Sequence, residues 1–276
     1  MAPAEILNKD ERCVTIPDIS DKLQEIGLCE GDIVLVHSSL GKIGPIEAIP
    51  LESRQMYAAA VFEAFANVLN LQKGGTLVVP TFTHEYARHG VPFIYEESPS
   101  EVGMFTEYVR KLPGALRSIH PINSFTAIGG KQREICEGVS ISCYGYNSVF
   151  DRLYQHKAKM LFLGASMRHM TLKHHLEQMV ALPYVYMKAY FTPVYKDGEE
   201  LRLPFLAVVK YLNGKVENND CSQFHEHLRQ RKMLQETKIG GANVVLTSII
   251  DAFDEGYELL QWDPCYFLEE PFYMTE

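Results

Sequence analysis

The sequence predicts an α/β protein in which helices flank a layered sheet that is largely parallel in its N-terminal part. Continuous apolar runs, typical of strands buried on both faces, occur at 33–36, 76–82 and 160–163. Helical patterns separate these runs, and this order predicts parallel strands joined by right-handed crossovers. Beyond Pro183 the runs become short and alternating, so the C-terminal third is expected to be rich in β-hairpins.

The N-terminal half alternates between helix and strand signals. Residues 14–29 are expected to form a short helix, because their apolar positions recur at helical spacing. Residues 51–70 predict a longer amphipathic helix between the first two strands, and 101–111 predict another. The segment 83–100 is expected to be a loop, because it mixes prolines and a glycine with aromatic residues.

The C-terminal third carries two strong hairpin signals, Asp197-Gly198 and Asn213-Gly214. Residues 221–236 are then expected to be helical. A strand at 242–247 and a short helix at 248–255 complete the predicted order.

Composition narrows the class of protein. With 276 residues, of which 46% are apolar, the chain can bury a sizeable core, and we expect a single domain over 1–276 with a β-rich subregion at about 184–247. The formal charge of −9 argues against a nucleic-acid partner. No apolar run approaches the roughly 20 residues of a membrane span. Scattered cysteines and the absence of a signal pattern favour a reducing, cytoplasmic location.

Residues 159–183 contain the most informative constellation. A buried strand ends at Gly164, and a helix is expected to begin at Thr171, so Thr171, His174 and Glu177 fall on one helical face. Histidine suits a general base near neutral pH, a carboxylate could orient it, and a hydroxyl could donate to an oxyanion. The same spacing also fits an N-cap followed by an exposed ion pair.

Further polar groups follow the other predicted strands. The segment HSSLGKIG (37–44) follows the first strand, PTF (80–82) ends the next, and RSIHPINS (117–124) supplies a cation and several donors. Ligands of open α/β sheets gather at the carboxyl ends of strands. Each segment, taken alone, is also explained by a plain structural role, and for 37–44 an ordinary turn is the better explanation. None of them is a Walker loop or a dinucleotide fingerprint.

Other chemistries have weaker support. No zinc motif is present, and His225 and His227 are spaced to diverge on a helix, so no metal is expected. Acyl transfer through a covalent acyl-enzyme on Cys136 or Cys143 is an alternative. Neither cysteine, however, has a histidine nearby in the sequence at a spacing that would suggest a base. A binding scaffold without turnover is a third hypothesis. The aromatic tail after Trp262 makes a homodimer a further expectation.

Taken together, these segments resemble the aminoglycoside 3-N-acetyltransferase superfamily. The resemblance covers about residues 24–256 and rests on ordered motifs rather than on one pattern. They are HSSL at 37–40, GTLVVPTF at 75–82, the stretch 98–129, the stretch 144–164, TLKHHLEQ at 171–178 and GGANVVLTSIIDAF at 240–253.

The resemblance implies transfer of an acyl group from an acyl-coenzyme A to a sugar amine without a covalent enzyme intermediate. His174 would be the base, Glu177 its partner and Thr171 a hydroxyl near the thioester. The positions that the resemblance assigns to the coenzyme A cleft are His37, Ser38, Ser39, Thr81, Phe82, Arg117, Ser118, His120 and Ser124.

Departures from the family pattern bear on the acceptor. Asn123 occupies a place where many drug-modifying members have histidine, and the loop after PTF is shorter and mixes charges with aromatics. That loop supplies the expected substrate-binding residues His84, Glu85, Tyr86 and Arg88. The residues of the motifs HPINSF (120–125) and HHLEQ (174–178) most closely resemble those of the branch that acylates nucleotide-linked amino dideoxy sugars for surface polysaccharides. Acetylation of aminoglycoside antibiotics is the alternative.

Overall fold

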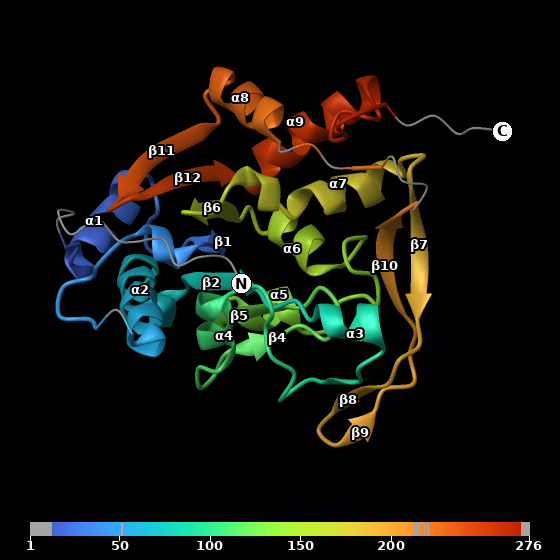
Figure 1. Cartoon of the computed structure of the whole chain (residues 1–276), viewed down its shortest axis with the longest axis horizontal. Helices are drawn as coiled ribbons and strands as arrows, with labels where there is room; N and C mark the ends of the chain where they lie inside the picture. The colour runs from blue at the N-terminus through green and yellow to red at the C-terminus, as the bar shows by residue number, and fades with distance from the viewer. Residues whose placement is uncertain (1–12, 51, 212–215, 218, 220, 272–276) are drawn as a thin grey trace.

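The structure, a computed structural model, describes residues 13–50, 52–211, 216–217, 219 and 221–271. Its centre is a seven-stranded sheet (Figure 1). In sheet order the strands are β11 (Leu234–Ile239), β12 (Ala242–Ser248), β6 (Lys159–Leu163), β1 (Ile33–Ser38), β2 (Thr76–Pro80), β5 (Phe125–Gly129) and β4 (Leu116–Arg117). The three central strands β6, β1 and β2 are parallel, and the outer strands pair antiparallel.

The central strands are buried on both faces, as their apolar runs predict. On β1, Leu35 packs into the core on one side of the sheet, whereas Val34 and Val36 pack into the core on the other. The period-2 alternation of side chains produces this division. Apolar residues at every position therefore stabilise two separate cores.

Helices cover both faces of the sheet. One face carries α1 (Ile16–Glu25), α2 (Arg54–Leu69) and α4 (Met104–Arg110). The opposite core takes side chains from α5 (Gln132–Cys136), α6 (Val149–Gln155), α7 (Leu172–Val180), α8 (Ser222–Gln230) and α9 (Ile249–Trp262). None of the helices in the described ranges is both long enough and apolar enough to cross a membrane.

Two small sheets stand beside the main one. Strands β7 (Val185–Tyr190) and β10 (Phe205–Lys210) form an antiparallel pair near the end of α7 (Figure 1). The Asp197-Gly198 hairpin is confirmed, because β8 (Val194–Lys196) and β9 (Glu199–Glu200) pair across it, and β3 (Phe93–Ile94) joins β8. The Asn213-Gly214 turn lies outside the described residues.

Three element predictions were wrong in part. The expected loop 83–100 contains the short helix α3 (His84–His89) as well as β3. The helix predicted for 221–236 ends at Gln230, and its last residues belong to β11, because pairing with β12 outweighs their helix propensity. The final helix extends to Trp262, well beyond the predicted end.

Candidate active site

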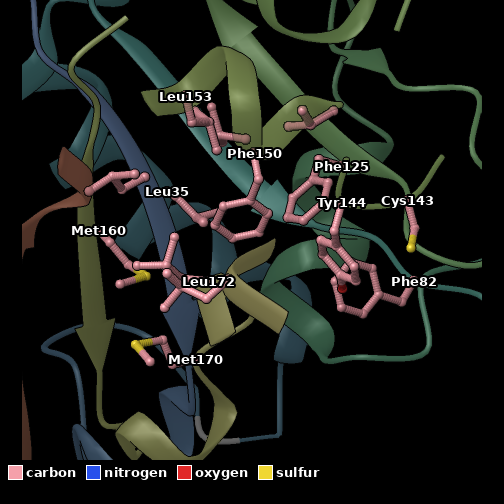
Figure 2. Packing of buried hydrophobic residues seen from close by; sticks show 14 of the residues in the cluster. Leu35, Phe82, Phe125, Cys143, Tyr144, Phe150, Leu153, Met160, Met170 and Leu172 are labelled. Atoms are coloured by element: carbon pink, nitrogen blue, oxygen red, sulfur yellow. The ribbon is translucent and has the colours of Figure 1, made fainter. Parts of the chain in front are cut away.

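Helix α7, which carries His174 and Glu177, is fixed in rotation by buried neighbours. Leu172 and Leu176 are completely buried, and Figure 2 shows Leu172 in the same core as Leu35. The Nδ1 atom of His175 donates a hydrogen bond to the carbonyl oxygen of Tyr144, which ties α7 to the loop before α6. These contacts leave the His174 side chain partly exposed and turn the Glu177 side chain inward.

His174 and Glu177 form the predicted pair. The Nδ1 atom of His174 lies 2.7 Å from Oε2 of Glu177, and the carboxylate side chain is only 1% exposed, against 34% for the imidazole. Since the carboxylate accepts a hydrogen bond from Nδ1, the Nε2 atom carries the lone pair that can take a proton. The ring of Tyr144 lies 5.6 Å from the imidazole and limits its rotation.

The Glu177 carboxylate is a buried charge held by several cations. Lys210 Nζ lies 3.2 Å from Oε1, and the Tyr184 hydroxyl donates to the same oxygen over 3.4 Å. Burial alone would raise the pKa of this carboxyl, but His174, Lys210 and Lys173 outweigh it and lower the pKa from 4.5 to about 2. Glu177 is therefore ionised throughout the physiological pH range.

Thr171 precedes α7 but does not cap it. No hydrogen bond joins its hydroxyl to the helix; instead Oγ1 lies 3.2 Å from Nε2 of His37, at the end of β1. The His37 ring stacks on Phe162, and burial lowers its pKa to about 3, so it stays neutral. The first strand and α7 thus meet at a hydrogen bond between two predicted site residues.

A hollow of about 500 Å³ opens where β1, β2 and β6 end, and we call it the strand-end hollow. Its walls include His37, Ser38, Ser39, Phe82 and His84 among the predicted residues, together with Thr171 and His174. Segments far apart in sequence therefore meet at one edge of the sheet, as expected for parallel strands. Three cations also line it: Lys42, which lies in the segment 37–44 noted in the sequence, and Arg168 and Lys173, which were not among the expected site residues.

A second hollow, of about 350 Å³, lies against β7 and β10, and we call it the β7–β10 hollow. It is lined by His174, Glu177, Val185, Tyr186, Lys188, Tyr190, Val208, Val209 and Lys210. His174 is the residue that lines both hollows. Groups bound on its two sides would both have access to the imidazole.

Five residues expected at the coenzyme A cleft lie behind its wall. Thr81, Arg117, Ser118, His120 and Ser124 are all buried and do not belong to the lining of the strand-end hollow. The Arg117 guanidinium donates to Ser124 Oγ over 2.9 Å and to the carbonyl oxygens of Thr81 and Ser98. These bonds connect the 117–124 loop to the segments that carry Thr81 and Ser98, so the Arg117 side chain supports neighbouring loops in this structure.

His120 is one of these supporting residues. Its Nε2 donates to the carbonyl oxygen of Leu206 over 3.1 Å, and its Nδ1 accepts from the backbone N–H of Asn123. Burial lowers its pKa to about 4, which keeps the ring neutral in this tautomer. The residue therefore links the 117–124 loop to β10.

The four expected substrate-binding residues separate in space. His84 lines the strand-end hollow, whereas Glu85 and Arg88 are exposed on α3 and belong to neither hollow. Tyr86 is buried, and its hydroxyl donates to the carbonyl oxygen of Thr192 over 2.7 Å. The helical turn of α3, which was predicted as a loop, directs these side chains to different sides.

The alternative nucleophiles are poorly placed. Cys136 and Cys143 are buried, and burial raises the pKa of each thiol to about 12. A thiolate is the reactive form, so neither side chain is suited to form an acyl-enzyme. Within the described ranges, no group of three or more His, Cys, Asp or Glu side chains is arranged to hold a metal ion.

The sequence reading missed the residues of β7 and β10. Lys188, Lys210 and Tyr186 come from short strands whose pairing is not local, and no motif marks them. Arg168 and Lys173, in contrast, lie inside the segment 159–183 that was singled out. Their position within a few residues of His174 in the sequence could have marked them as candidates for the site.

The chain is similar in sequence to known acetyltransferases. The family model described as aminoglycoside 3-N-acetyltransferase matches residues 35–261. Aminoglycoside N(3)-acetyltransferase IV of Salmonella sp. is 25% identical over 261 residues, covering 92% of this chain and 90% of the relative. The SPbeta prophage-derived aminoglycoside N(3')-acetyltransferase-like protein YokD of Bacillus subtilis (strain 168) is 28% identical, covering 87% and 90%.

Solved structures share the fold. The apoenzyme of aminoglycoside acetyltransferase AAC(3)-IVa superposes with a TM-score of 0.77 at 24% identity, covering 96% of this chain and 95% of its own. AAC-IIIb, solved as a binary complex with CoASH, gives a TM-score of 0.76 at 20% identity, covering 95% and 100%. Since the family model spans most of the sequence, the chain belongs to the aminoglycoside 3-N-acetyltransferase family of acyl-CoA-dependent N-acetyltransferases.

Proposed function

We propose that this protein transfers an acyl group from an acyl-coenzyme A to an amine carried by a sugar. The observation that carries the proposal is the position of His174. Its ring borders both hollows, and its Nδ1 is held 2.7 Å from a buried carboxylate. A base in this position can reach a donor on one side and an acceptor on the other.

The chemistry would proceed by direct attack. The amine nitrogen attacks the thioester carbonyl while His174 Nε2 takes a proton from it, and Glu177 stabilises the resulting imidazolium. Thr171, held by His37, would donate to the oxyanion. As the carbon–sulfur bond breaks, the imidazolium returns its proton to the coenzyme A thiolate. The amide and free coenzyme A then leave.

The strand-end hollow suits the coenzyme A thioester. Ser38 and Ser39 offer hydroxyls, and Lys42 and Arg168 supply positive charge for phosphates. A neighbouring hollow of about 640 Å³ shares Lys42 and residues 164–166 with it. This continuity offers room for the length of coenzyme A. His37, Ser38, Ser39 and Phe82 remain our proposed contact residues.

Two acceptor classes remain as proposals. The relatives described above are named for aminoglycosides, and AAC(3)-IVa has also been solved in complex with a gentamicin, so aminoglycosides are the acceptor that comparison favours. A nucleotide-linked amino sugar is the second candidate. Its support is the pair of lysines, Lys188 and Lys210, on the wall of the β7–β10 hollow.

The test is a direct assay of acyl transfer. Purified protein would be incubated with acetyl-CoA and, in turn, with gentamicin and with a dTDP-linked amino dideoxy sugar. Release of free thiol and the product mass would both be measured. We expect one N-acetylated product and no acetyl adduct on the protein. Failure to acetylate any amine despite measurable coenzyme A binding would contradict the proposal and favour a binding scaffold.

A further inference from the structure

The β7–β10 hollow combines aromatic rings with ammonium groups. Tyr186 and Tyr190 lie on its wall, and Lys188 Nζ lies 4.9 Å from the centre of the Tyr190 ring. Aromatic faces suit the apolar faces of a sugar ring, and nearby cations suit an anionic substituent on it. The hollow therefore offers both kinds of contact within a few residues of one strand.

The charges facing His174 are mainly positive. Lys42, Arg168 and Lys173 line the strand-end hollow, and Lys188 and Lys210 line the β7–β10 hollow. Among the described lining residues of the two hollows, the single carboxylate is Glu177, which already contacts His174 and Lys210. The whole chain has a formal charge of −9, so this is a local concentration of cations against the general charge.

Such a field discriminates between acceptors. A polycationic aminoglycoside would bring its ammonium groups beside Lys188 and Lys210, and like charges repel more strongly in a partly enclosed hollow than in water. An acceptor with a phosphate would gain attraction in the same place. Glu177 is too firmly paired to compensate for several extra ammonium groups.

We infer that the acceptor is an amino sugar that bears a phosphate group, bound in the β7–β10 hollow with Lys188 as a phosphate-binding residue. This inference rests on the proposed acyl transfer. Lys188 lies on an exposed stretch of β7 and is separate from the His174–Glu177 pair, so it can be changed without removing the base. Lys210 contacts Glu177 directly and is less suitable for a test.

The experiment compares two acceptors that share one amine. Steady-state acetylation of dTDP-4-amino-4,6-dideoxyglucose and of free 4-amino-4,6-dideoxyglucose would be measured, with gentamicin as the polycation. We expect a KM for the dTDP-linked sugar lower by about tenfold or more, corresponding to one well-formed charged contact. Lys188→Glu should raise that KM by about tenfold or more while kcat changes less than about twofold.

Lys196 is the matched control. Its Nζ also lies over a tyrosine ring, 4.7 Å from the centre of Tyr95, but it lines neither hollow. Lys196→Glu should leave both KM values unchanged. Calorimetric binding of the dTDP-linked sugar in the presence of coenzyme A, by wild type and both variants, gives a second readout that does not depend on turnover.

The outcomes separate this inference from the proposed function. Faster acetylation of gentamicin, with no effect of Lys188→Glu on the dTDP-linked sugar, would overturn the inference and leave acyl transfer intact. Binding of the dTDP-linked sugar that weakens in Lys188→Glu, without any acetylated product, would support Lys188 as a phosphate-binding residue but would contradict the transfer reaction and the role of this sugar as acceptor. The absence of both binding and turnover for the dTDP-linked sugar would also overturn the inference.

Discussion

The side chain of His174 gains its proposed role from neighbouring residues that are themselves buried. Glu177 is buried and ionised, Tyr144 limits rotation of the ring, and His175 anchors the helix. A base is most effective when its orientation is fixed before the substrate arrives. The residues that hold the imidazole in place therefore support its role as a base as much as the imidazole itself does.

Replacing His174 by alanine should lower kcat by about 10²-fold or more, because general base catalysis typically contributes about 10²–10⁴-fold. KM for acetyl-CoA should change by less than about threefold. Steady-state kinetics with whichever acceptor the transfer assay shows to be acetylated would measure both quantities. His89→Ala is the control, since that histidine is exposed on α3 and should not affect turnover. Near-normal turnover in His174→Ala would remove the proposed role.

Glu177→Gln should lower kcat by about 10–10³-fold, because an amide keeps the size of the side chain but cannot stabilise an imidazolium by charge. KM values should be little changed. Circular dichroism of the variant would establish that it is folded. An unaltered kcat in a folded Glu177→Gln enzyme would mean that the carboxylate serves only to hold α7 in place.

At the scale of elements, the turn after β6 lies against the segment that follows β1, and both segments line the strand-end hollow. Gly164 has a φ of +67°, and an added Cβ would lie 2.7 Å from the carbonyl oxygen of Ser39. That φ and that contact together disfavour any side chain here. The close approach of the β6 turn to the segment after β1 therefore depends on glycine.

Gly164→Ala should destabilise the protein by about 1–3 kcal/mol, because it combines backbone strain with a steric clash. It should also raise KM for acetyl-CoA, since Ser39 would be displaced. Urea unfolding and steady-state kinetics would measure the two effects. Gly41→Ala is the control: no atom lies within 4 Å of its added Cβ, and both quantities should stay near their wild-type values.

The elements differ in how far the sequence could predict them. Strands β1, β2 and β6 were predictable because both of their faces are buried, which requires continuous apolar runs. Strand β11 was not, because it lies at the edge of the sheet and most of its residues are exposed or half-buried and polar. Its identity as a strand depends on pairing with β12.

The residues of the candidate site also divide into those that local sequence could predict and those that depend on long-range packing. Thr171, His174 and Glu177 could be grouped because helical spacing is a local property. Arg117 and Ser124 were expected at the cleft, but their burial and mutual hydrogen bond depend on packing that no motif encodes. Lys188 and Lys210 could not be found, since two paired strands and one helix bring them to His174 from distant parts of the chain.

At the scale of the whole molecule, buried neutral histidines should make stability depend on pH. Burial lowers the pKa of His37 to about 3 and that of His120 to about 4. The unfolded chain takes up these protons below about pH 6.5, whereas the folded protein does not. Their stabilising contribution is therefore complete above pH 6.5 and is lost as pH falls toward 4.

The free energy of unfolding should accordingly decrease as pH falls from 7 to 5, by up to about 1.4 kcal/mol per pH unit for each such histidine. Urea unfolding at pH 7, 6 and 5 would measure it. His120→Asn should flatten the dependence, whereas His89→Gln should not, because His89 is exposed. A slope that is identical in wild type and His120→Asn would contradict this account of the buried ring.

The separation of β7 and β10 from the seven-stranded sheet has an evolutionary consequence. If the acceptor binds in the β7–β10 hollow as proposed, substitutions at the exposed positions of β7 would alter which molecule is modified, while His174, Glu177 and the contact of Lys210 with Glu177 remain unchanged. We expect libraries randomised only at Tyr186 and Lys188, which are exposed and line that hollow, to yield folded proteins with new acceptor preferences. The arrangement offers one route by which a common ancestor could give rise to enzymes with oppositely charged targets.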